Sequence, residues 1–119
     1  MIRSQLSLKP HPGCVQKVLD FYKDREILST SMAQAGCLSA EIRVPFTEEN
    51  LVVVSAVWES RSAYQSWLDN PARALSVTDL EPLLDHPDNQ LGNAELSEVH
   101  DFRSAASATP ELPMKKDTK

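Results

Sequence analysis

The chain has 119 residues and a formal net charge of −5, values that suit one compact acidic domain. An acidic balance argues against nucleic acid or an anionic membrane as the main partner, because both attract clustered lysine and arginine. The N-terminus lacks an apolar leader, and no apolar run approaches the roughly 20 residues that a membrane-spanning helix needs. We therefore expect a cytoplasmic protein.

The first two predicted elements are a strand and a long helix. "MIRSQLSL" alternates, with Ile2, Leu6 and Leu8 on one face, which is the period of a half-buried strand. Residues 14–35 contain no proline or glycine and carry apolar side chains at helical spacing, so they predict one continuous helix that Gly36 stops. Two cysteines at opposite ends of such a helix could not bridge, so both are predicted to be reduced.

Two further strands follow. "GCLSAEIRV" alternates in the same way as the first strand, and "LVVVSAVW" is the most strand-prone run in the chain. Its near-continuous apolarity is typical of a central strand that is covered on both faces. In a single subunit with helices on one face only, half of these side chains would meet water.

The second half of the sequence predicts two short helices and a last strand. Ser60 is a cap for a helix with Tyr64, Trp67 and Leu68, and Asn70-Pro71 opens another, which carries Leu75, Leu80, Leu83 and Leu84. "DHPDNQLGN" reads as a loop, and "AELSEVHDF" reads as a strand with His100 in its middle. Residues 1–103 form the predicted domain, and 104–119 form a polar tail that is mobile or packs on a partner subunit.

The order strand, helix, strand, strand, broken helix, strand predicts an α+β fold. It is the ferredoxin-like split βαβ pattern, with a four-stranded antiparallel sheet and helices on one face. Because residues 51–57 are apolar on both sides, we expect a second copy to cover the open face of the sheet. The sequence therefore predicts a homodimer.

Two stretches resemble the antibiotic biosynthesis monooxygenase domain family. They are "AGCLSAEI" and "LVVVSAVWESRSAYQSWLDNPA", and the resemblance extends over residues 1–103. It implies a dimeric α+β barrel with a pocket between the helices and the sheet of each subunit. The family includes cofactor-independent oxygenases of polycyclic phenols and quinones, haem-degrading enzymes, small-molecule isomerases and proteins without a known activity.

Three residues are characteristic of the haem-degrading branch, and this sequence has one of them. Trp67 matches the tryptophan of the second helix, but Val77 stands where that branch has a haem-ligating histidine ten positions later. The first strand, which should supply an asparagine, contains none. These departures argue against haem degradation, and no cofactor is expected.

Four aromatic residues are candidates for a ligand-binding site. Trp58 and Trp67 are large enough to dominate a small core, or they line a pocket. Tyr22 and Tyr64 each carry a hydroxyl that either orients a ligand or reaches water from the edge of the core. Both interpretations stay open for each residue.

Arg25 and His100 are the polar candidates. Arg25 falls within the apolar stripe of the first helix, so it pairs with a carboxylate such as Glu41, Glu59 or Glu98, extends to solvent, or binds an anionic ligand. His100 is either a general base near neutral pH or a hydrogen-bonded structural histidine. No two histidines have metal-ligand spacing and no Cys-x-x-Cys occurs, so no metal site is predicted.

The leading hypothesis is a cofactor-independent monooxygenase that acts on a small aromatic phenol or quinol. His100 would be the base, with Trp58, Tyr64 and Trp67 as walls and Tyr22 and Arg25 as further ligand contacts. One alternative is a non-catalytic binding or stress-response module of the same fold. The other is an isomerase of a small oxygenated metabolite.

Overall fold

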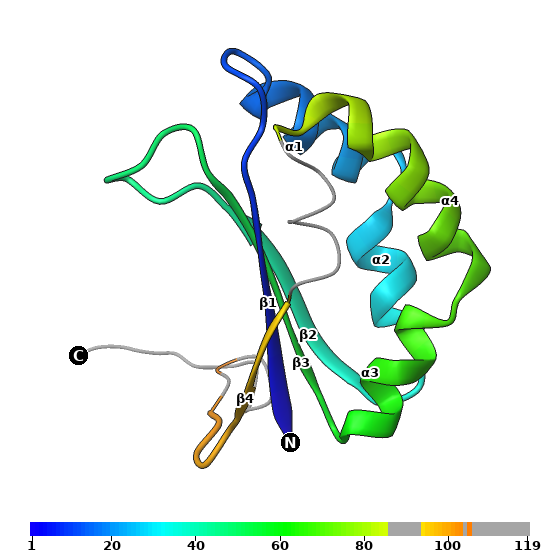
Figure 1. The fold of residues 1–119 in the computed structure, drawn as a ribbon. Coiled ribbons are helices and arrows are strands. Elements are labelled where there is room, and N and C mark those ends of the chain that lie inside the picture. The colour runs from blue at the N-terminus through cyan, green and yellow to red at the C-terminus, as the bar shows by residue number, and fades with distance from the viewer. Residues whose placement is uncertain (86–93, 104, 106–119) are drawn as a thin grey trace.

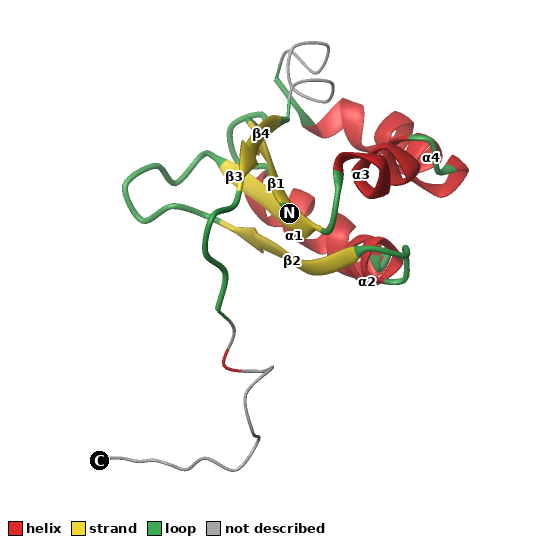
Figure 2. Ribbon diagram, turned by 90° about the horizontal axis from the view of Figure 1, so that it is seen from below, coloured by secondary structure: helices red, strands yellow, loops and turns green. Residues whose placement is uncertain are grey.

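The computed structural model describes residues 1–85, 94–103 and 105, and these form one layer of strands and one layer of helices (Figures 1 and 2). The elements in chain order are β1 (Ile2–Leu8), α1 (Val15–Asp24), α2 (Ile27–Met32), β2 (Cys37–Arg43), β3 (Val52–Trp58), α3 (Arg61–Leu68), α4 (Pro71–Leu80), the 3₁₀ turn η1 (Glu81–Leu83) and β4 (Glu95–Glu98). All strand pairs are antiparallel, in the order β2-β3-β1-β4. The predicted α+β ferredoxin-like fold, with helices on one face, is confirmed.

Strand register decides which side chains face the helices. Ile2 lies opposite Trp58 and Leu8 lies opposite Val52, so the even-numbered residues of β1 and β3 share the inner face of the sheet. All four side chains are at most 9% exposed. The alternation predicted for the first strand is therefore confirmed.

The buried side chains form two clusters under the helices. One contains Leu8, Val18, Tyr22, Val52, Leu80 and Leu84. The other contains Ile2, Ala56 and Trp58, against which the half-buried Tyr64 and Trp67 pack. In the second cluster Trp58 is fully buried, whereas Tyr64 and Trp67 stay half-buried.

The continuous helix predicted over residues 14–35 is wrong, because the chain breaks into α1 and α2 around Glu26. This residue adopts a left-handed conformation with φ of 52°, which a right-handed helix cannot contain. Glutamate has no strong preference for that conformation, so no local signal marks the break. The two cysteines are free thiols, as predicted.

The outer face of β3 is less open than the sequence indicates. Val53 and Val57 are only 3% and 1% exposed within a single chain, so the expectation that they would meet water is wrong. Polar side chains shield part of this face. Arg43 Nη2 on β2 donates to Gln5 Oε1 on β1 at 3.5 Å, so the two side chains meet across β3 near Ser55. A central strand flanked by long polar side chains is shielded by them.

The last strand is shorter than predicted. β4 ends at Glu98, so His100 lies beyond the strand and not in its middle. The loop predicted over residues 85–93 and the tail over 104–119 lie outside the described residues, apart from Asp85 and Ala105. None of the helices that the structure describes combines the length and the apolar character needed to span a bilayer.

Gly36 joins α2 to β2 at a point where a side chain would not fit. Its φ is +88°, and an added Cβ would stand 2.7 Å from Cβ of Ala63 on α3. We expect Gly36→Ala to lower the free energy of unfolding by about 2 kcal/mol, through backbone strain and this clash. Gly13→Ala is the matched control, because Gly13 has a φ of +82° but nothing within 4 Å of its Cβ position. If urea unfolding shows the same loss of unfolding free energy for both variants, the clash with Ala63 does not contribute to the effect.

Candidate functional site

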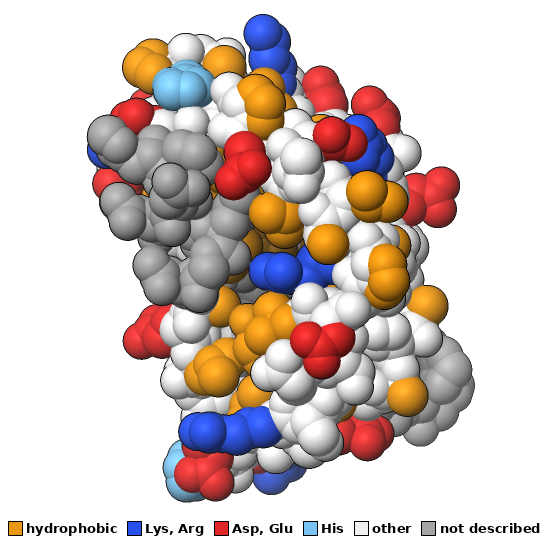
Figure 3. Space-filling model, turned by 45° about the vertical axis from the view of Figure 1, so that its right-hand side comes forward, with side chains coloured by type: hydrophobic (Ala, Val, Ile, Leu, Met, Phe, Trp, Pro, Cys, Tyr) orange, Lys and Arg blue, Asp and Glu red, His pale blue; other side chains and the backbone are white. Residues whose placement is uncertain are grey.

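A cavity of about 310 Å³ lies between the inner face of the sheet and the helices. Four of the predicted ligand-binding residues, Tyr22, Trp58, Tyr64 and Trp67, are brought together in its walls. The rest of the described wall is mainly apolar, with Leu6, Ile27, Leu28, Ala40, Val54, Ala56, Leu68, Val77, Leu80 and Ala94. Figure 3 shows hydrophobic side chains gathered around a hollow in the middle of one face, with basic side-chain atoms beside them.

Trp58 forms the rigid part of the aromatic wall. It is 1% exposed, and its indole Nε1 donates to Ser4 Oγ at 3.0 Å. The ring of Tyr64 stands 5.7 Å from it, tilted by 58°. Aromatic pairs at such separations and tilts attract one another, so the wall is held by packing as well as by the hydrogen bond.

Helix α3 carries two of the aromatic side chains to the cavity. The predicted cap is confirmed, because Ser60 Oγ accepts from the backbone N–H of Ala63 at 3.2 Å. Tyr64 and Trp67 are three residues apart and therefore share one face of this helix. Both are only half-buried, which follows from their facing an open space.

Helix α4 contributes the one basic residue of the described wall, which the sequence analysis missed. The predicted cap is again confirmed, with Asn70 Oδ1 accepting from the N–H of Ala72 at 2.8 Å. Four side chains at helical spacing then face the cavity, namely Arg73, Ser76, Val77 and Leu80. Leu75, one of the four leucines that the sequence assigned to this helix, is 69% exposed. The spacing from Leu80 back through Val77 to Arg73 is the signal that would have identified the correct face.

Arg73 places a positive charge near two phenol groups. Burial raises the pKa of Tyr22 to about 12, and the Arg73 guanidinium opposes part of that rise. Burial also raises the pKa of Tyr64, again with Arg73 acting in the opposite direction. Both tyrosines are therefore protonated at neutral pH, and their hydroxyls are hydrogen-bond donors inside the cavity.

The raised pKa of Tyr22 predicts a loss of stability at high pH. An unfolded tyrosine releases its proton near pH 10, whereas the folded one keeps it up to about pH 12. In this window the unfolded state binds fewer protons, so the free energy of unfolding should fall as pH rises, by on the order of 2–3 kcal/mol. The Tyr22→Phe variant should lack the part of this decrease in unfolding free energy that Tyr22 causes, as measured by urea unfolding at each pH. An identical pH dependence in both proteins would contradict it.

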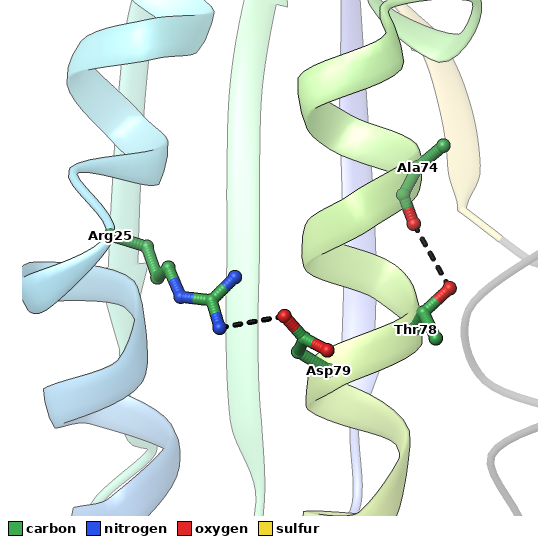
Figure 4. A network of polar contacts seen from close by, with 4 residues as sticks. All are labelled: Arg25, Ala74, Thr78 and Asp79. Atoms are coloured by element: carbon green, nitrogen blue, oxygen red, sulfur yellow. Dashed lines mark hydrogen bonds and ion pairs between the residues drawn. The ribbon is translucent and has the colours of Figure 1, made fainter.

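Arg25 does not reach the cavity. Its Nη2 forms an ion pair with Asp79 Oδ2 on α4 at 2.7 Å (Figure 4). The guanidinium carbon lies 4.7 Å from the centroid of the Phe21 ring. The partner is therefore Asp79 and none of the three glutamates that the sequence suggested. The two side chains are 43% and 50% exposed, which makes this a surface contact between helices. A role of Arg25 in ligand binding stays a prediction without support from its position.

His100 lies at the surface. Its side chain is 84% exposed, and Nε2 is 3.6 Å from Glu98 Oε1. It is not among the residues that line the cavity, so the structure does not bring it to the aromatic wall. The described part of that wall contains no histidine and no carboxylate, and the described residues contain no cluster of three potential metal ligands.

Comparisons with solved structures show the same fold. The protein Rv0793 from Mycobacterium tuberculosis matches with a TM-score of 0.65 at 13% identity, over 87% of this chain and 97% of that one. A Chloroflexus aurantiacus protein classed with the antibiotic biosynthesis monooxygenases gives 0.67 at 14% identity, over 87% and 96%. PA3566 from Pseudomonas aeruginosa gives 0.64 at 15% identity, over 86% and 94%. Among curated proteins, none matches this sequence.

The sequence itself assigns the family. The profile of the family described as antibiotic biosynthesis monooxygenase matches residues 1–74, which contain β1 through α3 and the start of α4. The matched region supplies Tyr22, Trp58, Tyr64, Trp67 and Arg73, the five residues that give the cavity its aromatic and cationic character. The chain therefore belongs to the antibiotic biosynthesis monooxygenase family.

Proposed function

We propose that this protein is a cofactor-independent monooxygenase that acts on a small aromatic phenol or quinol. The observation that carries the proposal is the cavity of about 310 Å³ with an aromatic wall and a single cation among its described residues. The aromatic wall can pack against a flat apolar ring, and the cation can pair with an ionised hydroxyl of the ligand. A volume of this size lies at the lower end of the range for small-molecule sites.

The reaction balances without a redox group in the protein. A ring carbon of the substrate loses its hydrogen and gains one atom of O₂ as a carbonyl oxygen. The second oxygen atom leaves as water with the hydrogens that the substrate gives up. The substrate supplies all the electrons, so the protein has to provide positioning, a dry site and stabilisation of the substrate anion.

Arg73 is the residue that we assign to stabilising the anion. A guanidinium in an apolar cavity favours the phenolate over the neutral phenol, and electron-rich phenolates give electrons to oxygen more readily. Tyr22, with a pKa of about 12, acts as a hydrogen-bond donor and not as a base at neutral pH. The substrate would then enter as the anion or pass its proton to solvent. His100 as the base remains a prediction from the sequence.

The open, apolar cavity favours this function over the alternatives. A filled or collapsed pocket would have supported the non-catalytic module. An isomerase of a small oxygenated metabolite needs several polar or charged groups around its substrate, whereas most described side chains of this cavity are apolar.

Oxygen uptake tests the proposal. The purified protein should consume O₂ with anthrone or a naphthoquinol faster than the substrate oxidises alone. With isotopically labelled O₂, one labelled atom should appear in the quinone and one in water. Uptake equal to that of heat-inactivated protein for a panel of phenols and quinols would contradict the proposed activity.

We also propose that the protein is a homodimer. The outer face of the sheet has no helix on it among the described elements, and the loop between β2 and β3 projects beyond the sheet (Figure 1). Phe46 in this loop is fully exposed, which is unusual for a phenylalanine outside a contact surface. Light scattering should give a dimer mass for the native chain, and Phe46→Asp should weaken association. A monomer at micromolar concentration would contradict the proposal.

A further inference from the structure

One hydroxyl on the sheet wall of the cavity has a proton without an acceptor. Ser4 on β1 is 7% exposed, lines the cavity, and accepts a hydrogen bond from Trp58 Nε1 at 3.0 Å. An indole N–H can only donate, so the Ser4 oxygen is the acceptor and its own O–H must point elsewhere. Within the described chain, no side chain or carbonyl accepts that proton.

The surroundings of Ser4 fix this arrangement. On the inner face its strand neighbours are Ala56 on β3 and Leu96 on β4, whose side chains offer no hydrogen-bond acceptor. Trp58 cannot turn away, because it is 1% exposed and packs against Tyr64. A buried donor without a partner is unfavourable, so an acceptor oxygen in the cavity would be favoured at this point.

The helix wall has the complementary groups. Tyr22 is 7% exposed and no described residue forms a hydrogen bond with its hydroxyl, while Arg73 acts on both Tyr22 and Tyr64 through its charge. The cavity therefore offers donors from both layers, namely a neutral hydroxyl from the sheet and a cation with two phenols from the helices. A ligand that contacts both needs two oxygen atoms on one ring system.

We propose that Ser4 determines specificity for aromatic substrates with a second oxygen, namely quinols and hydroxyquinones rather than simple phenols. This inference rests on the proposed function, in that it takes the cavity to be the substrate site. The ionised oxygen lies on the Arg73 side, and the second oxygen, a carbonyl or hydroxyl, accepts from Ser4. Ser4 binds and orients the ring, and it transfers no proton.

The test compares two anionic probes under anaerobic conditions, followed by quenching of tryptophan fluorescence. Lawsone is an ionised hydroxynaphthoquinone with additional carbonyl oxygens, and naphthoate has a similar ring and charge but no oxygen beyond its carboxylate. We expect Ser4→Ala to weaken lawsone binding about tenfold, the usual effect of one lost hydrogen bond in a buried site, and to change naphthoate binding less than about twofold. Ser7→Ala is the matched control, because Ser7 lies on the same strand with an exposed side chain.

A second measurement does not depend on any variant folding. The native protein should bind lawsone at least about tenfold more tightly than naphthoate, since only lawsone can satisfy the Ser4 hydroxyl. Equal affinities, or a Ser4→Ala variant that weakens both probes alike, would overturn the inference.

Binding and turnover separate the two proposals. A protein that shows the expected preference for lawsone but takes up no oxygen with any quinol keeps the inference about Ser4 and loses the proposed activity. A protein that oxygenates anthrone while binding the two probes equally keeps the activity and loses the role of Ser4.

Discussion

Replacing Trp58 with alanine is expected to lower the free energy of unfolding by about 3–5 kcal/mol. The side chain is 1% exposed and is the largest of the fully buried side chains. It packs with Ile2 and Ala56, against which Tyr64 and Trp67 rest, so its loss would enlarge the cavity rather than let the walls close. Removal of the indole also leaves Ser4 Oγ without its donor. Total stabilities of small domains are about 5–15 kcal/mol, so the variant would be near its unfolding threshold.

Urea unfolding followed by circular dichroism measures this loss. Leu75→Ala is the control for removing a large apolar side chain, because Leu75 is 69% exposed, and it should change the free energy of unfolding by less than about 0.5 kcal/mol. Trp67→Ala should fall between the two, since Trp67 is only half-buried. A Trp58→Ala protein as stable as Leu75→Ala would show that Trp58 contributes little to the packing.

The fold was predictable because its strands and caps have local signals. The alternation of β1 and the continuous apolar run of β3 are set by burial on one or both faces, and burial depends on side-chain type. The caps at Ser60 and Asn70 depend on one short side chain bonding to the next turn, so both helix starts were placed correctly. These signals determine the order of strands and helices along the chain, and that order indicates the topology of the sheet.

The break between α1 and α2 could not be predicted in this way. It depends on the left-handed conformation of Glu26, after which α2 contacts both α1 and β2. The end of β4 could not be predicted either, because pairing with β1 stops at Glu98 although the alternation in the sequence continues. Tertiary packing decides both, and neither glycine nor proline marks them.

The aromatic half of the site was predictable, and the charged half was not. Trp58, Tyr64 and Trp67 stand at a strand end and on one helix face, so their convergence follows from the topology. Arg25 was placed within the apolar stripe of the first helix, but periodicity cannot tell that this edge of α1 meets solvent and Asp79 rather than the cavity. Arg73 was missed, although it shares a face of α4 with Val77 and Leu80.

Arg73→Gln is expected to lower kcat/KM for quinol oxygenation by about 100-fold, the usual consequence of removing a group that stabilises a developing anion. Glutamine keeps much of the length of the side chain and two N–H donors but carries no charge. The substrate phenol would then ionise less readily in the cavity. The optimum of the pH profile should move upward, because a higher pH is needed to form the same fraction of phenolate.

Arg25→Gln is the matched control, since it removes the same charge from the same layer of helices. It breaks an ion pair whose partners are 43% and 50% exposed, so it should cost less than about 1 kcal/mol of stability and leave kcat/KM within about twofold. Oxygen uptake at several pH values distinguishes the two variants. If both variants lose activity alike, the effect belongs to the overall charge of the helical layer. If neither does, the anion is stabilised elsewhere. Only an effect confined to Arg73, with a shifted pH profile, identifies it as the group that binds the ionised substrate oxygen.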